Sequence, residues 1–457
     1  MNNIFLAEFR LFFKGRTNIW LLTAYFLLSI IALNIGIQNY ENELQAYEKL
    51  ELKYKHDLEK WMAKKNEASP GYIAYYLAQP AFFIPSSWSV LFPGERSEKL
   101  NLHRVRQLAI HGQIHGNPIR NLEHSVIGYL DFSIIWLYIL PLLIGILSVT
   151  CIADEKRLGR WLLLSSVASY RKIILNKLAV KFIIISLTHL IFLSIAVFLL
   201  KIPIDLTLVK ITTLLTSYTL FWFIISATIA FMHLNGRQSI LTFTTIWMCF
   251  SWLFPSLHYA SKMSSDTYNT GISLLLDQRQ SMNDSWDRDK KADLDKFLKK
   301  YPEWQNTEPL GEKFDWKWYY AMQKLSDDGV SKQVQRYYEQ KSSANSFWSY
   351  LSPNLITQNA LEDQADTSST DYVEYLEGMT DWHSRTQNFW FPYFFFKKEY
   401  EFKILQDLQP FIFQANNKLF LKFIIYWSIT LLIVTFFLFI TIIKPRKKFA
   451  FRELKSF

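Results

Sequence analysis

Cysteine is almost absent from this chain. Among 457 residues only Cys151 and Cys249 are cysteine, and each lies inside a long apolar run. No soluble segment can therefore close a disulfide, so any large part outside the cytoplasm has to be held together by its own apolar core. A metal site built from several cysteines is excluded for the same reason.

The common signatures of catalysis are missing too. The chain has 14 glycines and contains no Gly-x-x-x-x-Gly-Lys-Ser/Thr phosphate loop, so we do not expect it to hydrolyse ATP. Gly-x-Ser-x-Gly and His-Glu-x-x-His are also absent, and the acidic stretch DSWDRDKKADLD lacks the spacing of an EF-hand. We therefore expect a non-catalytic chain that holds no cofactor of its own.

Histidine offers the most tempting metal site. His111 and His115 are four residues apart, so both could face one ion if the segment were helical. However, Gly112 and Gly116 disfavour a helix, and the stretch GQIHGNP is typical of a turn. We expect no metal site and keep His111 and His115 as its candidates.

Long apolar runs are what the chain has in abundance. Half of its residues are hydrophobic and 17% are aromatic. Six runs have about 20 nearly uncharged residues, the length that crosses roughly 30 Å of hydrocarbon. These predicted spans are residues 18–37, 132–152, 182–200, 211–232, 239–257 and 418–443. We predict an all-α polytopic membrane protein with six transmembrane helices.

The placement of basic residues predicts the orientation of the chain. The net charge is +10, but the bases do not form a stripe interleaved with aromatics, so we expect no binding of nucleic acid. They lie before the first span, between the second and third, between the fourth and fifth, and in the tail, residues 444–457. With six spans these places share one side, so the positive-inside rule puts both termini in the cytoplasm.

Residues 1–17 predict a cytoplasmic helix that lies in the membrane interface and leads into the first span. Its apolar and aromatic residues can share one face, with the charged residues directed away from it. The expected apolar face consists of Ile4, Phe5, Phe9, Phe12 and Phe13, and the charged residues are Glu8, Arg10 and Lys14.

Two large segments remain on the far side of the membrane. Residues 38–128 open with a charged helical pattern that continues the first span outward, and residues 258–417 are long enough to form a domain. The stretches KADLDKFLKKYPEW and GVSKQVQRYYEQK are typical of helices, whereas EDQADTSSTD is typical of a loop. We expect both extracytoplasmic insertions to be mostly helical.

Residues 129–257 contain the second to fifth spans and, between the second and third, a charged segment at residues 153–177. Its acidic pair suits the positive end of a helix dipole, and RWLLLSSV offers an apolar surface to the membrane interface. We therefore predict a docking surface for a soluble partner. Its residues are Asp154, Glu155, Lys156, Arg157, Gly159, Arg160 and Trp161. The alternative, a solvated connector that only sets topology, stays open.

Residues 128–180 combine several features in a fixed order. They are a Gly-x-x-Asp-Phe approach, a mid-helix Pro-Leu, an acidic pair, a glycine, a Leu-Leu-Leu-Ser run and a lysine. In this chain they are Gly128, Asp131, Phe132, Pro141, Leu142, Asp154, Glu155, Gly159, Leu162 to Ser165, and Lys177. This order resembles the core of ABC type-2 transporter permeases. Residues 349–391 also resemble the end of an insertion that one branch of this family has before its last span.

The resemblance implies an ABC type-2 exporter fold and a set of partners. Each six-span subunit of such a dimer is joined through this charged segment to a separate ATPase, which binds ATP and magnesium. The N-terminal helix of the family also contacts the ATPase, which makes Glu8 and Arg10 candidate contacts. The implied location is the cytoplasmic (inner) membrane of a bacterium. Further expected partners are a second permease subunit, membrane lipids and another envelope protein.

Polar residues within the spans are candidates for a translocation path. His189 is an ionisable residue in the third span, and Asn34, Thr216 and Thr244 lie in other spans. The alternative is that these side chains hydrogen-bond neighbouring helices or their own backbone.

The expected function is that of a permease subunit that couples ATP hydrolysis by its partner to export, or to movement of its extracytoplasmic domains. A different class stays open, a membrane-anchored sensor or scaffold whose exported domain binds a ligand or a protein. No residue selects among drugs, lipids, glycans and peptides as cargo.

Overall fold

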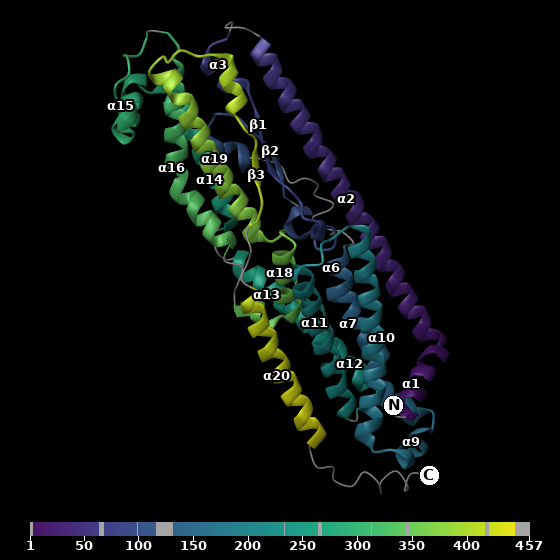
Figure 1. Ribbon diagram of the computed structural model, residues 1–457. Helices are drawn as coiled ribbons and strands as arrows, with labels where there is room; N and C mark the ends of the chain where they lie inside the picture. The colour runs from purple at the N-terminus through teal and green to yellow at the C-terminus, as the bar shows by residue number, and fades with distance from the viewer. Residues whose placement is uncertain are drawn as a thin grey trace.

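Six long apolar helices form a bundle in the computed structural model of the chain (Figure 1). The structure describes residues 3–63, 68–97, 99–115, 131–232, 234–263, 267–311, 313–342, 347–415 and 420–443. The helical segments long and apolar enough to cross a membrane are Arg16–Ala63, Phe132–Arg157, Tyr170–Leu199, Leu206–Phe231, Gly236–Ser261 and Leu421–Ile443. Each overlaps one predicted span, which supports the predicted multi-pass arrangement. The tail at 444–457 and the motif residue Gly128 lie outside the described residues.

The bundle is built from helices joined by short turns, with two π-helical turns, η3 and η4, inside the second and fifth spans. Its elements are α1 (Asn3–Lys14), α2 (Arg16–Ala63), α6 (Phe132–Ile134), η3 (Ile135–Ile139), α7 (Leu140–Ser148), α8 (Cys151–Arg157), α9 (Trp161–Val167), α10 (Tyr170–Leu199), α11 (Leu206–Phe231), α12 (Gly236–Met248), η4 (Cys249–Leu253), α13 (Phe254–Met263) and α20 (Leu421–Ile443). We call the end that carries α1, α8 and α9 the base (Figure 1).

The opposite end carries a second body, which we call the head (Figure 1). It contains the outer half of α2 together with two stretches of chain, residues 68–115 and 267–415. Its further elements are α3 (Pro70–Tyr76), β1 (Gln79–Phe83), η1 (Ser87–Val90), η2 (Gly94–Ser97), β2 (Leu102–Val105), α4 (Ile110–Ile114), α14 (Thr267–Asp287), α15 (Lys290–Lys300), η5 (Pro302–Trp304), α16 (Trp316–Ser342), α17 (Phe347–Leu351), α18 (Pro353–Gln364), α19 (Ser369–Phe395), η6 (Phe402–Asp407) and β3 (Phe411–Phe413).

Helix α2 connects the bundle to the head without a break. It has 48 residues, which at 1.5 Å per residue is about 72 Å, more than twice the thickness of the hydrocarbon core. In its outer half the hydroxyl of Tyr47 donates to the carbonyl of Phe83 (2.7 Å) and the hydroxyl of Tyr54 donates to the carbonyl of Leu408 (2.8 Å). The helix is therefore fastened to strand β1 and to the region before β3, as well as to the spans.

The head contains a small β-sheet, which corrects the all-α prediction. Its order is β2-β1-β3, with β1 antiparallel to β2 and parallel to β3. The central strand is buried at every residue, and Ala81 lies opposite Phe411 across the parallel pair. Since β1 and β3 come from different insertions, the two predicted insertions form one body. The chain is thus mostly helical, not entirely so.

The predicted helices of the second insertion are present as α15 and α16. The predicted loop EDQADTSSTD is much shorter than expected. Helix α18 ends at Gln364 and α19 begins at Ser369, where Ser368 and Asp371 form a reciprocal capping box. The serine and aspartate residues that suggested a loop therefore begin a helix.

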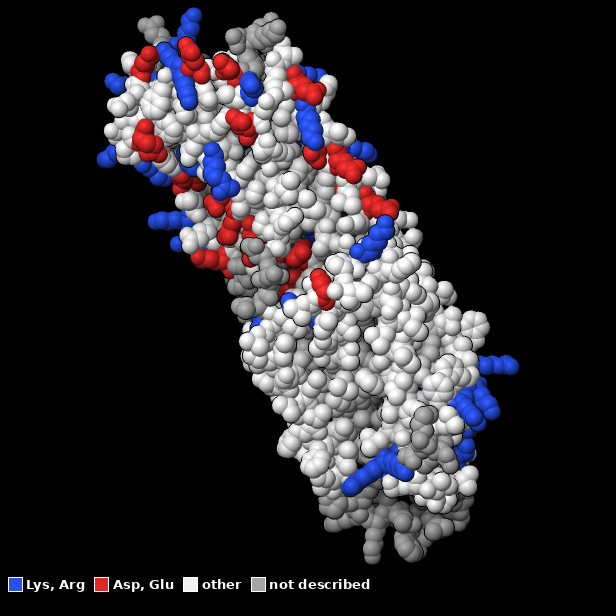
Figure 2. Space-filling model, viewed as in Figure 1, with Lys and Arg blue, Asp and Glu red and all other residues white. Residues whose placement is uncertain are grey.

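Charged residues divide the surface into zones. Figure 2 shows both signs of charge over the head, an almost uncharged middle zone, and lysine and arginine at the base. The uncharged zone follows the six apolar helices, as expected of a surface that faces lipid. The basic end is the one that the positive-inside rule assigns to the cytoplasm.

Candidate functional site

Helix α1 packs along α10 at the base and buries one face. Phe12 is buried and Phe5 and Phe9 are half-buried against the bundle core, so these residues form the predicted apolar face. Glu8 lies on this same face, because positions 5, 8, 9 and 12 share one side of a helix. Phe13 is exposed. The prediction that Glu8 points away from the apolar face and that Phe13 belongs to it is therefore wrong.

The predicted docking segment folds as two short helices joined by a tight turn. Helix α8 ends in a Schellman motif, in which the N–H of Arg160 donates to the carbonyl of Glu155 (3.0 Å) and the N–H of Gly159 to that of Lys156 (3.1 Å). Gly159 has a φ of +69°, the left-handed conformation that this motif requires. The remainder of residues 153–177, from Tyr170 onward, is already part of the spanning helix α10.

Four of the charged residues at the base form a connected ion network. The guanidinium of Arg160 donates to both carboxylate oxygens of Glu155, with distances of 2.9 and 3.2 Å. The ammonium of Lys177 lies 3.0 Å from Glu155 Oε1 and 2.6 Å from Glu8 Oε1. The side chain of Lys177 is only 6% exposed. The network therefore joins α1, α8, the turn before α9, and α10, with two positive and two negative charges.

The other predicted docking residues surround this network on the outer surface. Asp154 accepts a hydrogen bond from the hydroxyl of Thr150 (2.7 Å) and lies 3.4 Å from the guanidinium of Arg157. Trp161 is half-buried, with its ring 5.4 Å from that of Tyr170. Lys156, Arg157 and Gly159 are exposed, as is Arg10 on α1. Exposed apolar residues adjoin them: Leu158, Leu163 and Val167.

Lys177 is the residue of this site whose role the sequence did not reveal. It joins two carboxylates that are 169 and 22 residues away along the chain. A signal for it exists, since Lys177 and Lys181 lie one helical turn apart at the start of an apolar span. Lys181 donates to the carbonyl of Leu147 at the end of α7, so both lysines face protein.

The candidate path residues do not come together as a continuous path among the described residues. Nε2 of His189 lies 2.9 Å from the hydroxyl of Tyr25 on α2, the contact between helices that the alternative predicted. His189 and Thr216 line one cavity of about 130 Å³. The hydroxyl of Thr216 donates to the carbonyl of Thr212 on its own helix. Asn34 is exposed on α2, and Thr244 is half-buried on α12.

At the other end of the bundle, helix α18 of the head packs between the two π-helical turns. Pro141 has no N–H to donate to the carbonyl of Leu137, and this carbonyl instead accepts hydrogen bonds from the side-chain amide of Asn354 (3.0 Å) and from the hydroxyl of Tyr218 on α11. In η4 the carbonyl of Phe250 accepts from the hydroxyl of Ser352 (2.7 Å). Side chains of the head therefore donate to the irregular backbone of both spans, which ties the head directly to the bundle.

The two candidate metal ligands lie in the head. Residues Ile110–Ile114 form the short helix α4, so the predicted turn is wrong at its start, Gly112 to Ile114. Residues 116–118 of the predicted turn lie outside the described residues. The rings of His111 and His115 stack with centroids 5.7 Å apart. Within the described residues, no group of three or more histidine, cysteine or acidic side chains is placed to hold a metal ion. Among these residues, His111 and His115 are therefore not joined by a third metal ligand.

Several ionisable groups are buried inside the head. Burial lowers the pKa of His103 and of His111 to about 4 and that of His383 to about 3. Burial raises the pKa of Asp327 to about 7, although its carboxylate accepts hydrogen bonds from the N–H of Ile110 (2.9 Å) and from Gln278 (2.8 Å). The interior of the head is therefore sensitive to pH.

Comparison with known protein families matches part of the chain. The sequence model of the family described as "Domain of unknown function (DUF3526)" matches residues 273–414, less than a third of the chain. The match covers the head from within α14 to just past β3. No curated protein and no solved structure matches. The chain is thus a mostly helical, multi-pass membrane protein whose head contains a segment similar to that domain.

Proposed function

We propose that this protein is the permease subunit of an ABC transporter. In this proposal a separate ATPase docks at the base, and ATP hydrolysis there drives substrate export or movement of the head. The chain itself is not the enzyme, and ATP and magnesium are held by the ATPase. The proposal combines the resemblance of residues 128–180 to ABC type-2 permeases with the arrangement of charges at the base.

The observation that carries the proposal is the ion network of Glu8, Glu155, Arg160 and Lys177. It connects the N-terminal helix and the α8–α9 segment, the two parts that the resemblance assigns to the ATPase interface, to the third span. A push on the exposed surface of α8 and α9 would therefore move α1 and α10 with it. A solvated connector that only sets topology does not need a buried lysine shared by two carboxylates.

The opposite end of the molecule supports transmission toward the head. Helix α2 runs from the base into the head, and α18 fills the space beside the two π-helical turns. Such turns are irregular points at which a helix can change shape at low cost. Motion of the second and fifth spans would therefore be passed to α18 through Asn354 and Ser352. This arrangement favours movement of the head as one output of the ATPase cycle.

The remaining parts of the proposal concern location and partners. The base is rich in lysine and arginine, so we place it on the cytoplasmic side of a bacterial inner membrane. Both termini then lie in the cytoplasm, and the head lies outside it. A second permease subunit completes the dimer. The cargo, and an envelope protein that receives it from the head, are not specified by the site.

Purification of the full chain from its native membrane in mild detergent tests the proposal. An ATPase of the ABC class should be identified in the complex by mass spectrometry, and the complex should hydrolyse ATP. The informative variant is Arg157→Glu, because Arg157 is 77% exposed and lies outside the ion network. Its charge reversal should weaken ATPase association, or the turnover that depends on it, about tenfold. Lys49→Glu, an exposed reversal on the head part of α2, is the matched control.

Glu155→Lys provides a second variant with a different expectation. Glu155 is buried, so its reversal should lower the stability of the chain as well as ATPase association. A native complex without an ATPase chain would refute the proposal. Unchanged association and turnover in both variants would favour the sensor or scaffold instead.

A further inference from the structure

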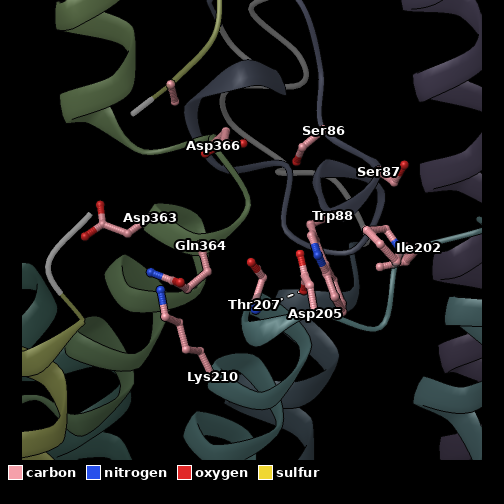
Figure 3. Close-up of a pocket in the computed structure, with 12 residues that line it drawn as sticks. Ser86, Ser87, Trp88, Ile202, Asp205, Thr207, Lys210, Asp363, Gln364 and Asp366 are labelled. Atoms are coloured by element: carbon pink, nitrogen blue, oxygen red, sulfur yellow. Dashed lines mark hydrogen bonds between the residues drawn. The ribbon is translucent and has the colours of Figure 1, made fainter. Parts of the chain in front are cut away.

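A polar pocket lies where the head meets the bundle, at the start of α11 (Figure 3). Its volume is about 310 Å³, at the lower end of the range for small-ligand sites. Three stretches of chain form most of it: the start of η1, the first turns of α11 with the residues before them, and the turn from α18 to α19. Neither the base nor the intramembrane cavity shares its residues, so a ligand here is distinct from anything bound at those places.

Gln364 and Lys210 offer polar groups to one point of this pocket. Gln364 is 8% exposed, and its amide makes no hydrogen bond with the residues that the structure describes. In Figure 3 this amide and the ammonium of Lys210 point toward one another. The ammonium lies 5.6 Å from the ring of Phe420 and has no ion pair in the described part of the chain. A ligand hydroxyl placed here can accept from the ammonium and pair with either end of the amide, because a hydroxyl both donates and accepts.

A second hydroxyl-binding point lies further along the same wall. Asp205 is the N-cap of α11, where its Oδ1 accepts from the N–H groups of Thr207 (2.9 Å) and Leu208 (3.1 Å). Its Oδ2 makes no hydrogen bond with the described residues and can accept from a ligand. Thr207 and Lys210 are three residues apart on α11, so both lie on one side of the helix, with Thr207 between Asp205 and Lys210 in Figure 3. An acceptor, a hydroxyl and a donor thus follow one another along this wall.

The charges of the lining favour a neutral ligand. Two of its carboxylates are already engaged, since Asp363 lies 3.5 Å from the ammonium of Lys422 and Asp366 has an interaction partner of its own. The groups that face a ligand include both a cation, Lys210, and a carboxylate, Asp205. A ligand with a net charge of either sign would therefore meet a like charge, whereas neutral hydroxyl groups pair with both.

The pocket also has an apolar wall, to which Trp88 and Ile202 contribute. A sugar ring suits such a mixed lining, because its hydroxyls donate and accept around the rim while its C–H face packs against apolar and aromatic side chains. We propose that the pocket binds one neutral hexose unit. Lys210, Gln364 and Asp205 bind its hydroxyls, and Trp88 packs against its ring.

The position of the pocket allows two sources for this hexose. It lies at the head end of the apolar spans, beside Ile204, which is 87% exposed, and Leu206, which is 67% exposed. Apolar side chains exposed at this level face lipid acyl chains, and the polar layer next to them is that of the headgroups. The hexose is therefore either the headgroup of a glycolipid or a free sugar, and the recognition chemistry is the same for both.

Saturation-transfer NMR of the full chain with glucose, galactose and mannose tests the chemistry. The detergent carries a polyoxyethylene headgroup, because a sugar-based detergent would itself compete for the pocket. At least one hexose should bind the wild-type chain, and its uronate, which adds a negative charge, should bind more weakly. Lys210→Met and Asp205→Asn should each weaken the hexose about tenfold, the contribution of one hydrogen bond to a charged group. Asparagine keeps the helix cap at position 205, and Lys53→Met, on the exposed face of α2, should change nothing.

A second measurement identifies the source of the hexose. The chain is purified from its native membrane, and retained lipids are measured by native mass spectrometry. A hexose-bearing lipid that wild type retains and Lys210→Met loses supports a glycolipid ligand. Hexose binding without such a lipid supports a free sugar.

Three results overturn the proposal. They are tighter binding of the uronate than of the hexose, unchanged hexose affinity in both Lys210→Met and Asp205→Asn, and the absence of both hexose binding and a hexose-bearing lipid that Lys210→Met loses. None of these measurements needs an ATPase, so failure of this proposal is distinguishable from failure of the proposed function.

Discussion

Replacement of Lys177 by methionine tests the ion network at the base most directly. The ammonium of Lys177 is 2.6 Å from Glu8 and 3.0 Å from Glu155, and the three side chains are 6%, 12% and 10% exposed. At an effective dielectric constant of about 20, each attraction amounts to roughly 6 kcal/mol before desolvation is subtracted. Desolvation offsets most of this, but removal of Lys177 takes the shared cation from Glu8 and leaves Glu155 with Arg160 alone, with both carboxylates still largely buried. We expect Lys177→Met to lower the free energy of unfolding by about 3 kcal/mol.

The free energy of unfolding is measured by denaturant titration of the purified full chain, followed by tryptophan fluorescence. Lys172→Met is the matched control, because Lys172 is exposed near the start of the same helix. The double variant with Glu8→Gln separates charge from packing. If the carboxylates repel each other, Glu8→Gln should recover about 1 kcal/mol in the Lys177→Met background. In the wild-type background the same change should be destabilising, since it removes a partner of Lys177.

Two outcomes would refute this reasoning. One is equal stability of Lys177→Met and Lys172→Met, which would mean that the buried ion pairs contribute nothing. The other is a loss on Glu8→Gln that simply adds to the loss on Lys177→Met. Additive losses would indicate two independent packing effects rather than one shared network.

Three further changes test other parts of the molecule. Gly145→Ala places a Cβ 2.2 Å from the ring of Phe243, so the chain should lose about 1–3 kcal/mol on thermal unfolding. In the control Gly236→Ala the added Cβ makes only ordinary contacts, so the stability should not fall. Equal melting temperatures of Gly145→Ala and Gly236→Ala would contradict the close packing of α7 and α12. Gly159→Ala should lower the free energy of unfolding by about 1 kcal/mol, because Gly159 has a positive φ, and Gly159→Asn should lower it less. An equal loss in the two variants would show that the left-handed conformation of Gly159 does not matter for stability. The buried histidines of the head have pKa values below 6.5, so the unfolded state binds more protons than the folded state, and stability should fall as pH drops from about 6.5 to 4. The buried carboxyl, with its pKa raised to about 7, opposes this trend, but three histidines outweigh it. His383→Gln should flatten the fall in melting temperature across this window, and an unchanged profile would exclude His383 as a cause.

The sequence was a good guide wherever the structure depends on local pattern. Each of the six long apolar helices overlaps a span that was predicted from a stretch of nearly uncharged apolar residues. The continuation of the first span into the head followed from helical spacing alone, and so did α15 and α16. The charged segment at residues 153–177 begins between two spans, as predicted, and the turn at Gly159 is a local feature of the same kind. Such features are encoded within one or two helical turns, so neighbouring residues suffice to predict them.

The sequence was a poor guide wherever residues far apart in the chain have to meet. The face of α1 was misread because a glutamate among phenylalanines is normally solvated, whereas here Lys177 brings Glu8 into the buried face. Strand β1 pairs with β3, which lies more than 300 residues later in the chain. Neither short apolar stretch contains a local pattern that predicts which strand it will pair with. Gly112 was expected in a turn, but contacts with α14 and α16 hold this segment in a helix.

The sequence by itself thus determined that the chain is a membrane protein with six apolar helices, which end of the bundle is basic, and which loop is charged. The length of an apolar run and the position of charged residues beside it are local properties of the sequence. They decide which segments span the membrane and which side each connection lies on. Only the tertiary structure decided that the two insertions form one head, that Lys177 joins Glu8 to Glu155, and that Gln364 and Lys210 face a common pocket. These features depend on which distant segments become neighbours, and that choice is made by packing of the whole chain rather than by any one stretch of it.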